Sequence, residues 1–146
     1  MAELSNEQVV RRYVAAHEAH DYDTVGALRH PDWTTEWPQS RERIRGHAND
    51  RAIMDNWPGG FPDTQTVTIV GSEDKFVLTP AYTVQRVAGS GDTWWIDGSA
   101  GYPDGSTWFF AAMIELGDGK IHAERWYFAP ELEAPAWRAA WVERMD

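Results

Sequence analysis

Residues 107–128, TWFFAAMIELGDGKIHAERWYF, form two runs of strand-forming residues around Gly117-Asp118-Gly119-Lys120. An Asp-Gly pair between such runs predicts a hairpin, because both residues accept the positive φ of a tight reversal. Alternation along the second run puts Glu124, Trp126 and Phe128 on one face. A carboxylate between aromatic residues suits catalysis or ligand recognition, and a solvated sheet edge is the alternative interpretation.

The length and composition indicate a single domain spanning residues 1–146. A chain of 146 residues is long enough to bury a core. Its aromatic content is 13%, with nine tryptophans. We therefore expect some of these rings to line a cavity or a subunit interface.

Charge and residue usage exclude several classes of function. The net charge of −10, without a Lys/Arg-rich run, disfavours nucleic-acid binding. The absence of cysteine excludes disulfides and thiol catalysis. The N-terminus, MAELSNEQ, is polar and acidic, unlike a signal peptide, and the apolar run Trp108–Ile114 is too short to span a bilayer. A soluble cytoplasmic protein without a membrane partner is the expectation.

The N-terminal segment predicts an amphipathic helix. Ser5 and Gln8 have the spacing of a capping box. Beyond them, Tyr13 and His17 lie one turn apart on the apolar face formed with Val10 and Val14. Each of these two polar rings needs a partner, either within the core or from a ligand.

The next segment predicts short elements. We expect a helix over 24–29, a charged exposed loop over 41–45 and a helix over 47–57. Between the first two, the strand Trp33–Trp37 would present both tryptophans and Thr35 on one face.

The second half of the chain predicts a run of strands. Valine, isoleucine, threonine and aromatic residues indicate strands over 65–70, 76–87 and 94–102, separated by turns at 71–75 and 89–92. Pro80 suggests an edge position or a bulge. Asp97 is a second candidate pocket acid, with an exposed strand bend as the alternative. A final helix carrying Trp137 and Trp141 would cover the sheet or pack against a second subunit.

This order of elements predicts an α+β fold. Helices come first, and about five or six long, bent strands follow. We expect a conical, curved antiparallel sheet with three N-terminal helices on its concave face and a short C-terminal helix. Such a sheet, closed at one end by helices, leaves an apolar cavity open at the other.

Three stretches carry a family resemblance: QVVRRYVAAHEAHDYDTVGAL, HPDWTTEWP and GDGKIHAERWYF. Together they resemble the nuclear transport factor 2-like superfamily, and within it the SnoaL-like branch near the ketosteroid isomerases. The resemblance implies a conical α+β barrel whose interior binds the ligand. Members include isomerases, polyketide cyclases, dehydratases, epoxide hydrolases and non-catalytic binding domains, so the fold does not decide the reaction.

The resemblance transfers only part of a known active site. Tyr13 stands where ketosteroid isomerases place the tyrosine that donates a hydrogen bond to the substrate oxygen. Their general-base aspartate corresponds to Trp37 here, and their second acid to Ala111, so that steroid mechanism is not expected. The aspartate that epoxide hydrolases carry in the last strand corresponds to Trp126. The family pattern still turns the face of Glu124 into the cavity.

The main functional hypothesis is an acid–base enzyme without a cofactor. Desolvation among aromatic rings would raise the pKa of Glu124 and make it a usable base. Tyr13, helped by His17, would donate a hydrogen bond to a developing enolate or alkoxide. The expected chemistry is isomerisation, cyclisation or dehydration of an apolar, often cyclic, carbonyl compound. Its predicted binding residues are Trp37, Trp57, Phe61, Phe109, Ala111, Met113, Trp126 and Phe128.

Other readings remain open. The same aromatic pocket could belong to a non-catalytic binder of small molecules. Alternatively, the sheet face and the helix with Trp137 and Trp141 could bind another protein. A homodimer, the commonest oligomer and the state expected here, would also bury them. His17 and His20 are one residue short of the zinc-protease helix spacing, so no metal is expected. The acid–base hypothesis likewise needs no cofactor.

Overall fold

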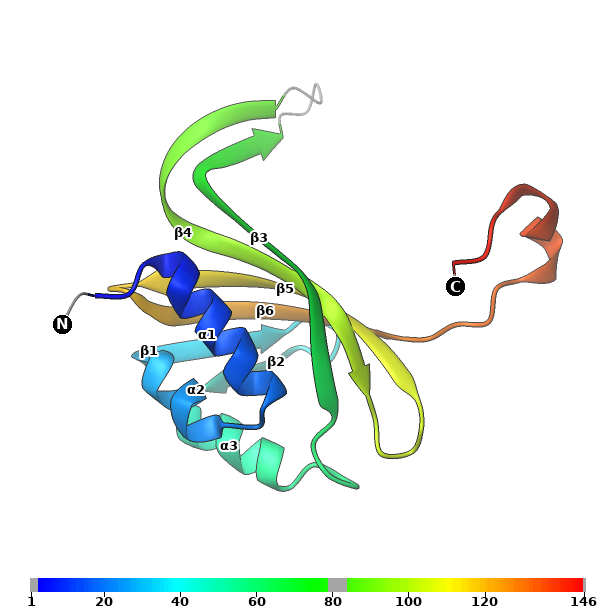
Figure 1. Cartoon of the computed structure of the whole chain (residues 1–146), viewed down its shortest axis with the longest axis horizontal. Coiled ribbons are helices and arrows are strands. Elements are labelled where there is room, and N and C mark those ends of the chain that lie inside the picture. Colours follow the sequence, from blue (N-terminus) through cyan, green and yellow to red (C-terminus); the bar gives the residue numbers. More distant parts are fainter. Residues whose placement is uncertain (1–2, 79–83, 146) are drawn as a thin grey trace.

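The computed structural model describes the backbone of residues 3–78 and 84–145, and the side chains of these residues except 68, 70 and 72–90 (Figure 1). The elements run in the order α1 (Asn6–Glu18), α2 (Tyr22–Leu28), β1 (Arg29–Trp37), β2 (Glu42–Arg45), α3 (His47–Asp55), β3 (Asp63–Leu78), β4 (Val84–Gly101), β5 (Thr107–Gly117), β6 (Lys120–Pro130) and a 3₁₀ helix, η1 (Ala136–Trp141). The predicted α+β class with helices before a long-stranded sheet is confirmed.

The described strands form a six-stranded sheet in the order β2-β1-β6-β5-β4-β3. It curves around α1, and all three α-helices lie on its concave side (Figure 1). The expectation of a purely antiparallel sheet is wrong in one place, because β1 and β6 run parallel. β2 and α3 lie between β1 and β3 in the chain, and the later strands follow one another as antiparallel neighbours.

Local sequence signals account for the best-predicted elements. Ser5 Oγ accepts from the backbone of Gln8, whose side chain accepts from the backbone of Ser5, as the capping box requires. At the β5–β6 hairpin, Asp118 and Gly119 adopt φ values of 54° and 72°. Positive φ at both central residues is the geometry of a type I′ turn, so the predicted hairpin is confirmed.

The predicted turns at 71–75 and 89–92 are wrong, because both segments lie within long strands. β3 pairs with β4 on both sides of them, and the register shifts between Ser72 and Asp74. The small residues opposite this shift form an irregularity in the ladder and do not reverse the chain. Pro80 lies outside the described residues.

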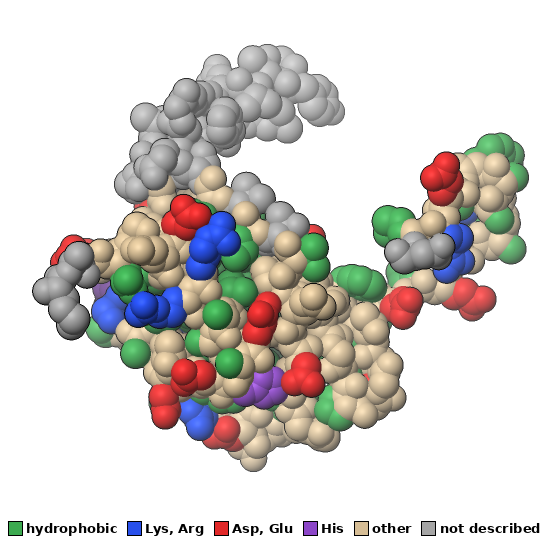
Figure 2. Space-filling view, viewed as in Figure 1, with side chains coloured by type: hydrophobic (Ala, Val, Ile, Leu, Met, Phe, Trp, Pro, Cys, Tyr) green, Lys and Arg blue, Asp and Glu red, His purple; other side chains and the backbone are tan. Residues whose placement is uncertain are grey.

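Two other predictions need correction. The charged segment expected as a loop at 41–45 contains β2, which pairs with β1 and buries Ile44. The C-terminal element does not cover the sheet, since the six residues of η1 are exposed, with Trp137 at 74% and Trp141 at 79%. Figures 1 and 2 show this segment standing apart from the body. In the described part of the chain, no helix is long and apolar enough to cross a bilayer.

Candidate active site

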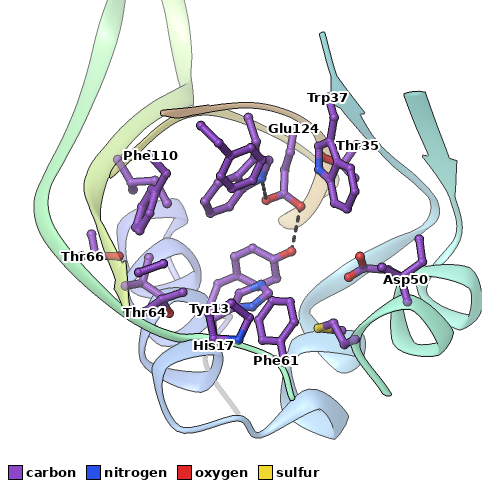
Figure 3. Close-up of a pocket in the computed structure, with 18 of the residues that line it drawn as sticks. Tyr13, His17, Thr35, Trp37, Asp50, Phe61, Thr64, Thr66, Phe110 and Glu124 are labelled. Carbon is purple, nitrogen blue, oxygen red and sulfur yellow. Dashed lines mark hydrogen bonds between the residues drawn. The ribbon is translucent and has the colours of Figure 1, made fainter. Parts of the chain in front are cut away.

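An apolar cavity of about 90 Å³ lies between the helices and the concave face of the sheet (Figure 3). Among the described residues, nine Tyr, Trp and Phe side chains line it: Tyr13, Trp33, Trp37, Trp57, Phe61, Tyr102, Phe110, Trp126 and Phe128. A second space of about 430 Å³ adjoins it, sharing Trp37, Trp57, Tyr102 and Phe128 as lining residues. The site therefore has an inner cavity and an outer chamber separated by aromatic rings.

Most of the predicted site residues meet at the inner cavity. Eight of them line it: Tyr13, His17, Trp37, Trp57, Phe61, Glu124, Trp126 and Phe128. The prediction that Phe109, Ala111 and Met113 line it is wrong. Both faces of β5 looked buried in the sequence, but Phe110 faces the cavity and Phe109 is 49% exposed on the opposite face. Asp97 is also absent from the described lining of this cavity.

Glu124 is the acidic centre of the cavity, with an exposed fraction of 4%. The Tyr13 hydroxyl donates to its Oε2 over 2.7 Å, and the Trp33 indole N–H donates to the same oxygen over 2.6 Å. The Trp126 indole N–H donates to Oε1 over 3.0 Å. These donors come from α1, β1 and β6, so the orientation of the carboxylate depends on the tertiary fold.

Arg29 is a site residue that sequence reasoning missed. Its Nε donates to the Tyr13 hydroxyl over 2.7 Å, and its Nη1 donates to Asp50 Oδ2 over 2.7 Å. Nη1 also lies 2.9 Å from His47 Nδ1, and the guanidinium carbon is 3.6 Å from the Trp33 ring centroid. Because Tyr13 accepts from Arg29, its single proton points at Glu124. In this arrangement the phenol orients the carboxylate and does not donate to a ligand.

Sequence reasoning missed Arg29 and its partner Asp50, although the sequence holds a signal for each of them. Arg29 precedes Trp33 by an even number of residues, which allows the same strand face, although the register shifts within this part of β1. Asp50 lies on the helical face of Ile53, Met54 and Trp57, at spacings of three, four and seven residues. A charge on each of two apolar faces is the pattern of a buried ion pair.

Burial and neighbouring charges set the pKa values of Glu124 and Arg29. Burial raises the pKa of Glu124, although nearby Arg29 and the hydrogen bonds from Tyr13, Trp33 and Trp126 oppose this. Burial alone would lower the pKa of Arg29, but Tyr13, Glu124 and Asp50 raise it above its usual value. Arg29 therefore stays charged and is balanced directly by Asp50. Glu124 is a further buried carboxylate, and its burial, which outweighs the charge of Arg29, keeps its pKa above the usual value.

Two polar side chains face the cavity without a partner. The hydroxyl of Thr35 and Nε2 of His17 are buried and have no hydrogen-bond partner among the described residues. Thr35 is the direct register partner of Glu124 across the β1–β6 ladder. The His17 ring instead meets the edge of Tyr13, with centroids 4.7 Å apart. Both groups are available to a ligand.

Within the described residues, no cluster of three or more His, Cys, Asp or Glu side chains has the geometry of a metal site. The arrangement that is present suits proton transfer. It combines an oriented carboxylate of raised pKa, a neighbouring hydroxyl that is free to donate, and aromatic walls that exclude water.

Comparison with known proteins agrees with the fold. The SnoaL-like domain family matches residues 10–124. A search of curated proteins finds no match. Among solved structures, an NTF-2 like protein of unknown function from Burkholderia xenovorans LB400 has a TM-score of 0.67 and 26% identity, covering 97% of this chain and 95% of that chain.

Two further solved structures share the nuclear transport factor 2-like fold at lower identity. A candidate ketosteroid isomerase from Kribbella flavida DSM 17836 has a TM-score of 0.67 and 19% identity, covering 97% of this chain and 90% of that chain. An LEH-like epoxide hydrolase from M. tuberculosis has a TM-score of 0.57 and 17% identity, covering 85% and 82%. At these identities the likeness concerns the fold.

Proposed function

Because the chain belongs to the SnoaL-like domain family, we propose that it is a small-molecule enzyme performing cofactor-independent acid–base chemistry on an apolar, carbonyl-containing substrate. The observation that carries this proposal is Glu124, a buried carboxylate of raised pKa on the wall of an aromatic cavity. A carboxylate in such surroundings is a stronger base than one in water, and it can hold a proton during the reaction.

The distribution of hydrogen bonds on Glu124 indicates which oxygen would react. Oε2 accepts from both Tyr13 and Trp33, whereas Oε1 accepts from Trp126. We infer that Oε1 removes a proton from the carbon beside the carbonyl. The C–H electron pair forms the enolate double bond, and the carbonyl π electrons move onto oxygen. Return of the proton to the same carbon gives exchange, and return to another carbon gives isomerisation.

Thr35 is placed to stabilise the enolate. Its hydroxyl is buried beside Glu124 and has no partner in the described part of the chain. In the proposed reaction it donates to the enolate oxygen, the role that the sequence assigned to Tyr13. A donor that is already oriented stabilises developing charge without reorganisation of solvent. Tyr13, fixed between Arg29 and Glu124, then acts as a positioning residue.

Isomerisation, cyclisation and dehydration all begin with this proton transfer, so the first test should measure it directly. Cyclohexanone and 2-tetralone would be incubated with the protein in D₂O, and loss of the α-proton signal would be followed by NMR. We expect catalysed exchange with at least one ketone and its loss in Glu124→Gln. Glu115→Gln, a matched change at an exposed position of β5, should keep the wild-type rate. Equal exchange in the wild type and Glu124→Gln rejects the proposed base.

A non-catalytic binding protein is the second candidate. The observation in its favour is that the hydrogen-bond donors of Tyr13, Trp33 and Trp126 already satisfy much of the carboxylate. A binding pocket needs polar groups that orient a ligand but no reactive base. Tight binding of a ketone without any catalysed exchange would favour this candidate.

A further inference from the structure

The inner cavity has a second polar region, away from Glu124. It is formed by His17 of α1 together with Thr64 and Thr66 of β3, all of which line the cavity (Figure 3). Nε2 of His17 is buried, and no described residue forms a hydrogen bond with it. Burial of an unpaired polar atom is costly, so this nitrogen indicates where a polar atom of a ligand would bind.

The charge state of His17 limits the kind of ligand atom. Burial and the nearby charge of Arg29 lower the pKa of His17 to about 3, so the ring is neutral near pH 7. A neutral imidazole nitrogen donates in one tautomer and accepts in the other. A hydroxyl group both donates and accepts, and therefore satisfies either tautomer. A carboxylate would suit only one tautomer and would add another buried charge.

Tyr13 contacts both polar regions. Its hydroxyl is 2.7 Å from Glu124 Oε2, while its ring centroid is 4.7 Å from that of His17. The carboxylate therefore meets the hydroxyl of Tyr13, and the imidazole meets its ring, so Tyr13 lies against both polar groups. A ligand ring lying beside Tyr13 would reach both with substituents on opposite sides. The inner cavity of about 90 Å³ is smaller than an engineered cavity of about 150 Å³ that binds benzene, so a substituted ring would also occupy part of the adjoining space of about 430 Å³.

We propose that His17 forms a second polar subsite, and that the ligand is an apolar six-membered ring with a hydroxyl opposite the carbonyl that meets Glu124. The position of the carbonyl rests on the proposed function. The hydroxyl subsite rests separately on the unpaired nitrogen of His17. Larger ring systems of this class would extend into the adjoining chamber of about 430 Å³.

The test uses two probes that differ by one hydroxyl, cyclohexanone and 4-hydroxycyclohexanone. Binding would be followed by tryptophan fluorescence, since Trp33, Trp37 and Trp126 line the cavity, and checked by ligand-observed NMR. The wild type should bind the hydroxyketone about threefold to tenfold more tightly, the gain from one net hydrogen bond. His17→Phe should reverse this preference, because the hydroxyl would be buried without a partner.

Two further variants separate the subsite from a general loss of structure. His122→Phe is the same change at an exposed position of β6 outside the cavity lining, and it should keep the wild-type preference. His17→Gln keeps a polar side chain and should retain part of the preference. If circular dichroism shows that His17→Phe does not fold, the comparison uses His17→Gln. This variant must then prefer the hydroxyketone less strongly than the wild type does.

Equal affinity of the wild type for the two ketones, binding of neither, or a preference that survives in His17→Phe overturns the subsite. The deuterium-exchange assay keeps the two proposals apart. Exchange into cyclohexanone without a hydroxyl preference leaves the proposed base standing and rejects the subsite. A hydroxyl preference without catalysed exchange supports the subsite and rejects the proposed base.

Discussion

Replacing Tyr13 by phenylalanine would test the network that orients Glu124. The substitution keeps the ring but removes the hydroxyl that donates to Glu124 Oε2 over 2.7 Å and accepts from Arg29 Nε over 2.7 Å. The hydrogen bond from Tyr13 favours the ionised carboxylate and so lowers the pKa of Glu124 against the dominant effect of burial. Its loss should therefore raise the pKa of Glu124 further.

The magnitudes follow from the same two contacts. A hydrogen bond to a charged group contributes about 1.5–3 kcal/mol, which corresponds to at least about a tenfold change in the ionisation equilibrium of the carboxyl. Leaving Arg29 Nε buried without its acceptor costs about 1–3 kcal/mol of unfolding free energy. For a chain of this length, the melting temperature should fall by roughly 3–10 °C.

The assay is a titration of Glu124 by NMR with ¹³C-labelled glutamate, together with thermal denaturation. The carboxyl of Tyr13→Phe should titrate at higher pH than in the wild type. Well below the wild-type transition, proton exchange into cyclohexanone should be at least about tenfold slower in the variant, because the ionised fraction of Glu124 is that much smaller. Tyr127→Phe, on the exposed face of β6, is the matched control and should change neither property. A Glu124 titration that stays in place or moves to lower pH would refute the role given to Tyr13.

Other variants probe the remaining parts of the site and the C-terminus. Asp50→Asn leaves Arg29 as a buried charge without its direct partner, and should cost about 3–5 kcal/mol in urea denaturation. Thr35→Val keeps the shape but removes the proposed donor, so exchange should fall about 10²-fold while stability stays equal or rises, and an unchanged rate would reject that role. His17 protonates near its usual pKa of 6.5 when unfolded and near 3 when folded, so the unfolded state binds more protons between these values. Stability should therefore fall as the pH drops from 6.5 toward 3, and His17→Gln should flatten this slope. Removing residues 131–146 should shift the melting temperature by no more than about 2 °C, because the described residues 131–145 bury little surface. A larger, concentration-dependent loss would mean that it packs against a second copy of the chain.

Burial and neighbouring charges together set the electrostatics of the cavity. Arg29 and Asp50 neutralise each other at 2.7 Å, and Glu124 is held by neutral donors from tyrosine and tryptophan. Burial outweighs the opposing effects of these donors and of the nearby Arg29 charge, so the pKa of Glu124 stays above its usual value. The site thus combines a fixed carboxylate geometry with a raised pKa.

Local patterns in the sequence were sufficient for part of this structure. Asp118-Gly119 predicts the last hairpin because few residue pairs accept positive φ twice in succession. Strand alternation predicts that Glu124, Trp126 and Phe128 share a face, and helical periodicity does the same for Tyr13 and His17. These properties depend on backbone geometry over a few residues, and the structure confirms that these side chains meet at one cavity.

The tertiary structure alone decided the rest. Arg29 is buried because Asp50, from α3, and Tyr13, from α1, surround its guanidinium, and no local pattern states that these elements meet. The inward face of β5 depends on its pairing with β4 and β6, so the sequence could not distinguish Phe109 from Phe110. Local backbone geometry determines where a chain turns and how often its side chains return to the same face of a helix or strand. Which faces become interior, and which charges become partners, depends on contacts between segments distant in sequence.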